Sequence, residues 1–236
     1  MAFGRLRKNK QEQDTNDDAR SDEEDAGAIA EAPASGPYDV ADKPSEEGYV
    51  DLGALRIAAA EGLQLRLEVE EKTQRVVAVT LDLNGSSLQL QAFAAPRSDT
   101  LWDDIRGQIG KSVGSQGGTV DELEGVFGTE LLAKVPAQAQ DGSKGFRVAR
   151  FVGVDGPRWF LRGVFGGPAA MDPAAAGPLE EVFRNVVVVR GEQPLPPRDL
   201  LQLRLPRDSS PLPRAGGATS DRPAPPERGP EISTIG

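Results

Sequence analysis

Alternating apolar and polar residues mark the first folded segment of the chain. Apolar side chains occupy every second position from Leu63 to Val69, which is the period of a half-buried strand. Two further strand-like runs, Val76 to Leu83 and Ser86 to Phe93, flank Asn84-Gly85, a dipeptide favoured in hairpin turns because both positions need a positive φ. The pattern therefore predicts a strand followed by a hairpin with one buried face. The predicted register pairs Leu81 with Leu88 and Val79 with Leu90.

The stretch from Phe146 to Gly167 predicts a second hairpin, with Asp155 to Arg158 as its loop. Its opposite face also carries aromatic residues, so we expect this hairpin in the middle of a sheet, covered on both sides. The expected register pairs Val154 with Trp159, Val152 with Leu161 and Val148 with Phe165 on the core face.

Capping signals predict two helices. Ser98, Asp99 or Thr100 can cap the first helix, which continues with an apolar stripe from Leu101 to Ile109. Asp172-Pro173 begins the second helix. The run that follows it, Val186 to Val189, is β-branched throughout and favours a strand.

Strand, hairpin and helix follow one another in residues 63–106 and again in residues 129–184. We therefore predict an α+β fold in which a largely antiparallel sheet packs against two helices. The repeated order suggests two βββα halves from a duplication, and chance reuse of a common unit is the alternative. The predicted organisation is a disordered basic-then-acidic tail at 1–48, one α+β domain at 49–191 and a Pro-rich extended or disordered tail at 192–236. Within the last segment, Leu200 to Leu205 is a candidate docked strand.

Composition removes many kinds of chemistry. The chain has no histidine and no cysteine, which excludes imidazole bases, thiol nucleophiles, disulfides and the usual zinc sites. The formal net charge is -10, and most of this net negative charge comes from residues before 50. Nucleic-acid binding is therefore an unlikely function for the domain. We predict no cofactor, no transmembrane segment and a cytoplasmic location, since no apolar run suits a membrane span or a secretory signal.

Short acidic and glycine motifs have simple structural interpretations. Gly110-Lys111-Ser112 lacks the earlier glycine of a phosphate-binding loop and is expected at a helix end. The acid pairs Asp103-Asp104 and Glu180-Glu181 are expected on solvated helix faces, because adjacent helical side chains diverge. Asp121, with Glu122 beside it, is the one acid that we retain as a candidate for Mg²⁺ binding or carboxylate chemistry.

Arginine and aromatic residues gather on one face of the second hairpin. Arg147, Phe151, Phe160 and Arg162 form a candidate interaction patch, since this is the composition of protein-binding hot spots. The alternative is a strand face covered by the second helix. Arg150 is expected on the core side, where its stem covers Trp159 or its guanidinium pairs with a buried acid.

The N-terminal decapeptide is basic. Arg5, Arg7, Lys8 and Lys10 form a candidate tether to an anionic surface, because basic residues near such a surface each contribute about 1 kcal/mol. The alternative is a solubilising segment that the following acidic run neutralises.

Three segments together resemble a known protein family. They are Arg158 to Gly163, Val186 to Gly191, and a Pro-rich Leu-x-Leu segment that ends at Pro206. With the Phe127-Gly128-x-Glu130-Leu131 stretch, they resemble the family catalogued as domain of unknown function 3710 over roughly residues 40–206. The resemblance implies an actinobacterial, cytoplasmic protein and assigns no catalytic residues.

The leading functional hypothesis is a non-enzymatic cytoplasmic protein-interaction module with an unidentified protein partner. The alternative is a small-ligand-binding domain, or a carboxylate-based enzyme acting on a phosphorylated or nucleotide-like compound. Anionic-surface tethering through the N-terminal peptide is a weaker third hypothesis.

Overall fold

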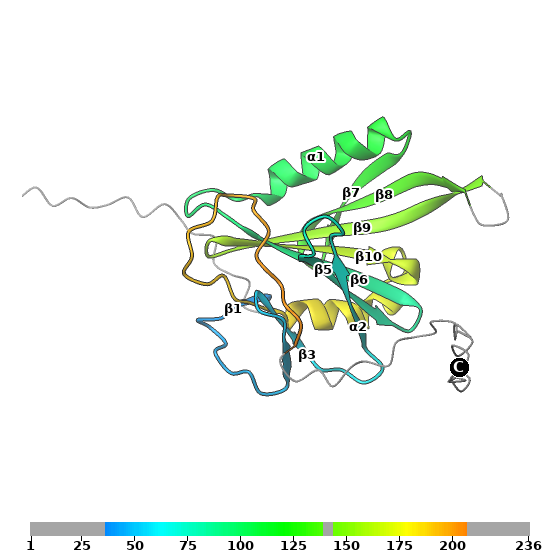
Figure 1. Ribbon diagram of the computed structural model, residues 1–236. Helices are drawn as coiled ribbons and strands as arrows, with labels where there is room; N and C mark the ends of the chain where they lie inside the picture. The colour runs from blue at the N-terminus through cyan, green and yellow to red at the C-terminus, as the bar shows by residue number, and fades with distance from the viewer. Residues whose placement is uncertain (1–35, 139–143, 207–236) are drawn as a thin grey trace, which may run out of the picture.

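The computed structural model describes residues 36–138 and 144–206. In this part of the chain, two helices and two sheets are stacked in layers (Figure 1). The strands are β1 (Tyr38–Asp39), β2 (Tyr49–Asp51), β3 (Leu55–Ala58), β4 (Gln64–Val69), β5 (Val76–Leu83), β6 (Ser86–Ala94), β7 (Thr119–Gly125), β8 (Gly128–Gln138), β9 (Lys144–Gly156), β10 (Trp159–Gly166) and β11 (Val187–Val188). The helices are α1 (Trp102–Ser115) and α2 (Pro173–Arg184), with a 3-10 helix, η1, at Gly167–Ala170. Of the predicted tails at 1–48 and 192–236, residues 1–35 and 207–236 lie outside the described residues.

The larger sheet, here called the main sheet, is antiparallel throughout. Its strand order is β4-β5-β6-β10-β9-β8-β7. The β5–β6 hairpin has the predicted register, with Leu81 opposite Leu88, and turns at Asn84-Gly85 with positive φ at both residues. The prediction of an α+β fold with a largely antiparallel sheet and two helices is confirmed.

The β9–β10 hairpin departs from the predicted register by two residues. Trp159 lies opposite Gly156 and Leu161 opposite Val154, so the turn is Pro157-Arg158 alone. Arg158 takes a φ of 63°, which closes the turn without a glycine. A Cβ on Gly156 would collide with the indole of Trp159, so glycine opposite the tryptophan makes room for the ring. A two-residue shift leaves every side chain on its predicted face.

A smaller sheet packs against one face of the main sheet. Its order is β1-β11-β3-β2, and β1 runs parallel to β11 with Tyr38 opposite Val187. The indole N–H of Trp159 donates a hydrogen bond of 2.7 Å to Asp39 Oδ2. The paired strands thus include residues before 49, the predicted start of the domain. Segments distant in sequence make these contacts, so local composition did not reveal them.

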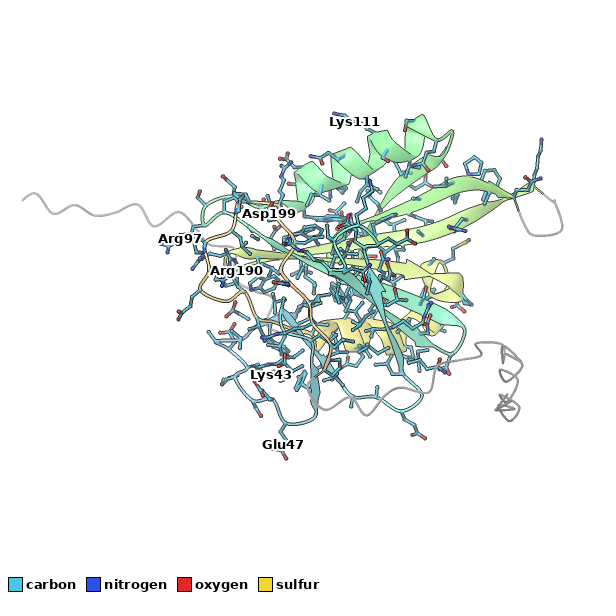
Figure 2. All side chains as sticks on the ribbon, viewed as in Figure 1. Lys43, Glu47, Arg97, Lys111, Arg190 and Asp199 are labelled. Carbon is cyan, nitrogen blue, oxygen red and sulfur yellow. The ribbon has the colours of Figure 1, made fainter. Side chains whose placement is uncertain are left out.

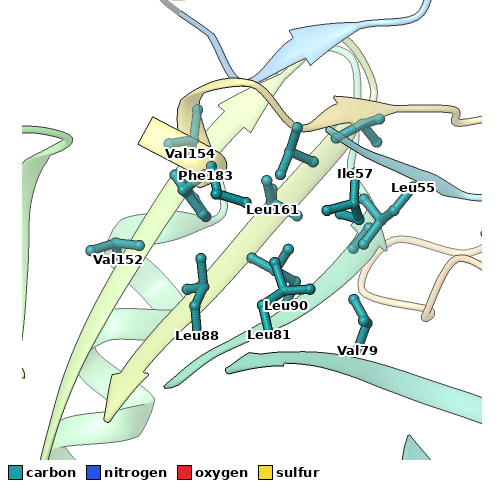
Figure 3. Packing of buried hydrophobic residues seen from close by; sticks show 14 of the residues in the cluster. Leu55, Ile57, Val79, Leu81, Leu88, Leu90, Val152, Val154, Leu161 and Phe183 are labelled. Atoms are coloured by element: carbon teal, nitrogen blue, oxygen red, sulfur yellow. The ribbon is translucent and has the colours of Figure 1, made fainter. Parts of the chain in front are cut away.

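Two helices cover opposite faces of the main sheet (Figure 1). The small sheet and α2 enclose the main core, which contains Leu55, Val79, Leu161 and Phe183 (Figure 3). Helix α1 covers the other face over β7, β8 and β9. Without the extra edge strand β7, the strand order is symmetric about the β6–β10 pair, but a two-fold axis there would put both helices on one face. The two halves therefore do not superpose as βββα units.

Helix α1 is capped from a distant strand. Its N-terminal cap residue, Leu101, makes no side-chain cap bond, and Ser98, Asp99 and Thr100 do not supply one. Instead Asp155 accepts hydrogen bonds from the backbone N–H groups of Leu101 at 2.7 Å and Trp102 at 3.2 Å. Burial raises the pKa of Asp155, and these two donors partly offset that increase.

Residues 190–204, here called the strap, connect the two sheets. The predicted docked segment lies here: Leu201 and Leu203 are buried, and the Leu201 N–H donates to Ala92 O at 2.9 Å. Leu203 forms bridges to Gly53 and to Val76. The strap therefore enters the main sheet where β5 and β6 separate, and the Gln91 side chain also bonds there, donating to Val77 O at 3.2 Å.

Candidate functional site

The candidate interaction patch does not form one exposed surface. Phe160 is 0% exposed beneath α1, with its ring 6.1 Å from Trp102 and 6.0 Å from Phe93 between centroids. Phe151 packs partly buried against the same cluster, while Arg147 is exposed farther along β9. The physical reason is that α1, not the second helix, covers this face and removes its aromatic centre from solvent.

Arg162 is a half-buried cation on the same face. Its Nη2 donates to Gln91 Oε1, and its guanidinium lies 5.6 Å from the Phe93 ring. Its Nε is buried without a hydrogen-bond partner among the described residues, and burial lowers the pKa of Arg162. Together with Gln91, Arg162 fixes the β6–β10 pair at the margin of the area that α1 covers.

Arg150 joins a buried carboxylate cluster on the opposite face. Its Nη1 lies 3.2 Å from Glu130 Oε2, and its Nη2 lies 2.7 Å from Glu180 Oε1. The guanidinium also stacks 4.5 Å from the Phe165 ring centroid. The expectation that Arg150 pairs with a buried acid is confirmed. One cation thus ties β9 to β8 and to α2.

The Glu130 side chain is 0% exposed. Burial raises its pKa, while the charge of Arg150 and a hydrogen bond from the Phe127 N–H lower it. Gly125 makes room for the carboxylate, because a Cβ there would overlap Glu130. Each of the three charged side chains in the cluster has an ion-pair partner, although Arg150 Nε is buried without a hydrogen bond among the described residues. The cluster therefore connects β8, β9 and α2 as a latch.

The acidic candidates for catalysis lie apart. Asp121 pairs with Lys134 at 3.3 Å, and Glu122 pairs with Arg106 at 3.3 Å. Adjacent residues on β7 point to opposite faces, so these carboxylates do not converge. No group of three or more acidic residues suited to a metal ion occurs among the described residues.

The remaining candidate motifs lie on an exposed helix surface or outside the described residues. Lys111 lies on the exposed side of α1, in the C-terminal half of the helix (Figure 2). Arg5, Arg7, Lys8 and Lys10 lie outside the described residues. No helix in residues 36–138 or 144–206 is long and apolar enough to cross a membrane.

A cavity of 340 Å³ lies beside the strap, between the strap and the start of β3. Its apolar lining comes from Ala54, Val189, Leu195 and Leu201. The volume lies within the usual range of small-molecule pockets. Strand β11 leads directly into one wall, and the returning strap forms another.

Two arginines give this cavity its charge. Arg190 and Arg204 both line it, and neither makes an ion pair with a described residue. Gln193 and Gln202 also line it, and among the described lining residues none is Asp or Glu. The cavity therefore carries two positive charges that no facing carboxylate neutralises.

Arg190 is held by backbone oxygens. Its Nε donates to Arg158 O at 3.2 Å, and its Nη1 donates to Gln193 O at 2.8 Å. Partial burial and the nearby Arg158 charge lower the pKa of Arg190, although an arginine stays protonated at neutral pH. Figure 2 shows Arg190 at the same end of the molecule as Arg97 and Asp199.

Arg204 lies against Gly53. Its Cγ and Nε occupy the space that a Cβ on residue 53 would need, at 2.7 and 2.6 Å. Gly53 has a φ of 85°, and its N–H bonds to Asp51 Oδ1 at 2.8 Å, so the tight turn before β3 seats the arginine stem. The Arg204 N–H donates to Leu52 O at 2.8 Å, which fixes the strap at this point.

A second cavity, of 450 Å³, shares strap residues with the first. It is lined by Gln193, Leu195, Leu201 and Gln202, and it extends toward the end of β4. Its charged lining is mixed, with Glu70, Asp199 and Arg75. The net positive character therefore belongs to the first cavity.

Sequence analysis did not identify this site. The prediction placed Arg190 at the last residues of the domain and Arg204 in the candidate docked strand of the Pro-rich tail. The available signals were the Leu-x-Leu spacing at Leu201 and Leu203 and the tight turn at Gly53. Neither signal indicates that two arginines line one cavity.

The comparisons with known proteins identify the family. Residues 36–211 match the family model described as Protein of unknown function (DUF3710). The match covers well over half of the chain, so the chain belongs to this family, and it includes the whole cavity lining. No curated protein matches the chain.

Proposed function

We propose that this member of the family binds a small organic anion in the strap cavity, as a non-catalytic ligand-binding domain. The observation that carries the proposal is the pair of arginines, Arg190 and Arg204, which line one cavity without a neutralising carboxylate. Arginine presents several N–H donors in a planar group that matches carboxylate and phosphate oxygens.

The cavity's shape supports a ligand with both charged and apolar parts. Leu195 and Leu201 offer an apolar wall, and the amides of Gln193 and Gln202 can bond to polar substituents. A phosphate or carboxylate group on a short organic body satisfies both requirements. Both groups are oxyanions, and the probes below distinguish a phosphate ligand from a carboxylate ligand.

The residues that line the strap cavity favour binding without catalysis. The charged lining residues of the cavity are arginines alone, which stay protonated and therefore neither accept nor donate a proton at neutral pH. Asp121 and Glu122, the acids that the sequence suggests for catalysis, lie on β7 and do not line either cavity. This weighs against a carboxylate-based enzyme.

The test is titration calorimetry of the full chain with inorganic phosphate, AMP and hexanoate at constant ionic strength. We expect at least one probe to bind and its affinity to fall by about 10- to 100-fold in Arg190→Gln and in Arg204→Gln. The estimate follows from about 1.5 to 3 kcal/mol for a hydrogen bond to a charged group. Tight binding of AMP with weak binding of hexanoate identifies a phosphate ligand, and the reverse identifies a carboxylate.

Arg97→Gln is the matched control. Arg97 is exposed, lines neither cavity and makes no ion pair with a described residue, yet its replacement changes the net charge equally. We expect that variant to bind like the wild type. Equal weakening in all three variants indicates general charge attraction, and no binding by any probe at about 10 mM contradicts the proposal.

The protein-interaction function expected from the sequence remains a separate proposal. Its aromatic centre, Phe160, is buried, so a partner would have to use another surface. Co-purification from host lysate with the wild type and with Arg147→Glu tests the exposed part of that patch. A partner captured by the wild type and lost with the variant supports the proposal, and equal capture excludes Arg147 from the contact.

A further inference from the structure

The strand β4 is an outer edge of the main sheet. It pairs with β5 on one side only, and no main-chain hydrogen bond from residues 64–69 goes to any other described segment. The edge carries partly exposed apolar residues, with Val69 49% exposed and Leu65 and Leu67 half-buried. Unpaired N–H and C=O groups along such an edge can accept another strand.

The sequence of this edge is complementary to itself. When two copies of β4 run antiparallel with Leu67 opposite Leu67, each Arg66 lies opposite the Glu68 of the other copy. Leu65, which packs against the core, then lies opposite the exposed Val69, just beyond the register shift that the β4–β5 ladder makes between Glu68 and Val69. Both charged pairs are attractive, and the most exposed apolar residue of the edge gains an apolar neighbour.

Neighbouring registers are less favourable. A shift that centres the pair on Arg66 places two arginines opposite each other, and a shift that centres it on Glu68 places two glutamates opposite each other. Shifts by one residue bring polar side chains against apolar ones. The register centred on Leu67 is therefore the one that gives favourable side-chain pairs on both faces of β4.

The two charged side chains of this edge already have partners on the same chain. Thr80 Oγ1 donates to Glu68 Oε1 at 2.5 Å, and the Gln89 amide lies 2.8 Å from both oxygens, so the carboxylate is directed over β5 toward β6. Arg66 pairs with Asp82 on β5 at 2.6 Å, with its side chain 67% exposed. Pairing through this edge therefore requires Arg66 and Glu68 to share these bonds with the side chains of the second copy.

We propose that two copies of this chain pair through their β4 edges about a two-fold axis at Leu67, joining two main sheets into one continuous sheet. The opposite edge, β7, does not suit self-pairing, because Asp121, Glu122 and Glu124 give it a concentration of negative charge. The edge strands of the small sheet, β1 and β2, have two and three residues and offer little pairing length.

Charge reversal with mixing tests this pairing. We expect light scattering after gel filtration to show wild-type dimers at about 1 to 300 µM, the range of weak edge contacts, and monomers for Arg66→Glu and for Glu68→Arg. An equimolar mixture of the two variants restores both charged pairs, so it should form heterodimers. The double variant Arg66→Glu with Glu68→Arg should again form homodimers. A monomeric wild type, or a dimer that survives both single reversals, overturns the proposal.

A cysteine test avoids the charge changes. Because the chain contains no cysteine, Leu67→Cys introduces a single thiol that lies opposite its own copy in the proposed register. Mild oxidation should give a covalent dimer for this variant and much less for Leu65→Cys, whose copies lie several residues apart. Equal cross-linking by both variants, or none by Leu67→Cys, rejects the register.

Discussion

Replacing Arg150 by methionine tests the buried carboxylate latch. The change removes the cation that lies 3.2 Å from Glu130 and 2.7 Å from Glu180, and it keeps an unbranched apolar side chain over Phe165. Removing one partner of a buried ion pair leaves an uncompensated charge, which typically costs about 3 to 5 kcal/mol. All three ionic side chains are at most 14% exposed, so solvent screens little of this loss.

The pH dependence of the variant has a definite sign. Arg150 lowers the pKa of Glu130, so without Arg150 that pKa rises further above its ordinary value. A carboxyl group whose folded-state pKa is raised favours folding at low pH, and this contribution is lost as the pH rises through the folded pKa. The stability gap between Arg150→Met and the wild type should therefore be widest near neutral pH. It should narrow as the pH falls toward about 4.3, the ordinary pKa of glutamate.

The measurement is urea unfolding of both proteins at neutral and mildly acidic pH. Adding Glu130→Gln to Arg150→Met should recover part of the lost free energy of unfolding at neutral pH, because it removes one of the two unpaired charges. A loss below about 1 kcal/mol, or a gap that does not narrow in acid, would show that the cluster is well solvated and that the reasoning is wrong.

Four further predictions concern stability. Phe160→Ala should lower the free energy of unfolding in urea by about 3 to 5 kcal/mol, because the ring is fully buried; a loss typical of a surface site would contradict that position. Asp155→Ala should lower it by about 1 to 2 kcal/mol and speed amide exchange at the start of α1, whereas unchanged exchange would mean that the helix does not need this cap. Gly153→Ala should lower the melting temperature through overpacking worth about 1 to 3 kcal/mol, since a Cβ there meets the Trp102 ring, while Gly107→Ala, with open space around its Cβ, should not. In the otherwise unchanged protein, Glu130→Gln should flatten the decline in stability above about pH 4.3, and an unaltered pH profile would assign that decline to other groups.

Local patterns predicted the elements better than their partners. The β5–β6 hairpin follows from Asn84-Gly85 and strict alternation, which together leave one register. The β9–β10 register depends on the indole of Trp159 lying over Gly156, a packing requirement that alternation does not contain. The cap of α1 comes from Asp155 on β9, far along the chain, so the local candidates Ser98 to Thr100 were wrong.

The candidate site was less predictable for the same reason. Arg190 follows a strand that the sequence does indicate, but Arg204 belongs to a Pro-rich segment without clear periodicity. They line one cavity because Leu201 and Leu203 anchor the returning strap to two sheets at once. Composition did exclude thiol and imidazole chemistry, and the structure adds that no described acid lines the first cavity and that Asp121 and Glu122 line neither cavity.

The pairing of β1 with β11 also determines when the protein can finish folding as it emerges from the ribosome. Tyr38 cannot pair until Val187 has been synthesised. The strap cannot connect the two sheets until Leu203 has been synthesised as well. Until then Leu55 and its neighbours lack their cover, so the nascent chain holds exposed apolar surface through most of its synthesis. Contacts so distant in sequence slow folding. A fragment of residues 50–191 would keep this apolar surface exposed, because it lacks β1 and most of the strap, the two segments that close the core.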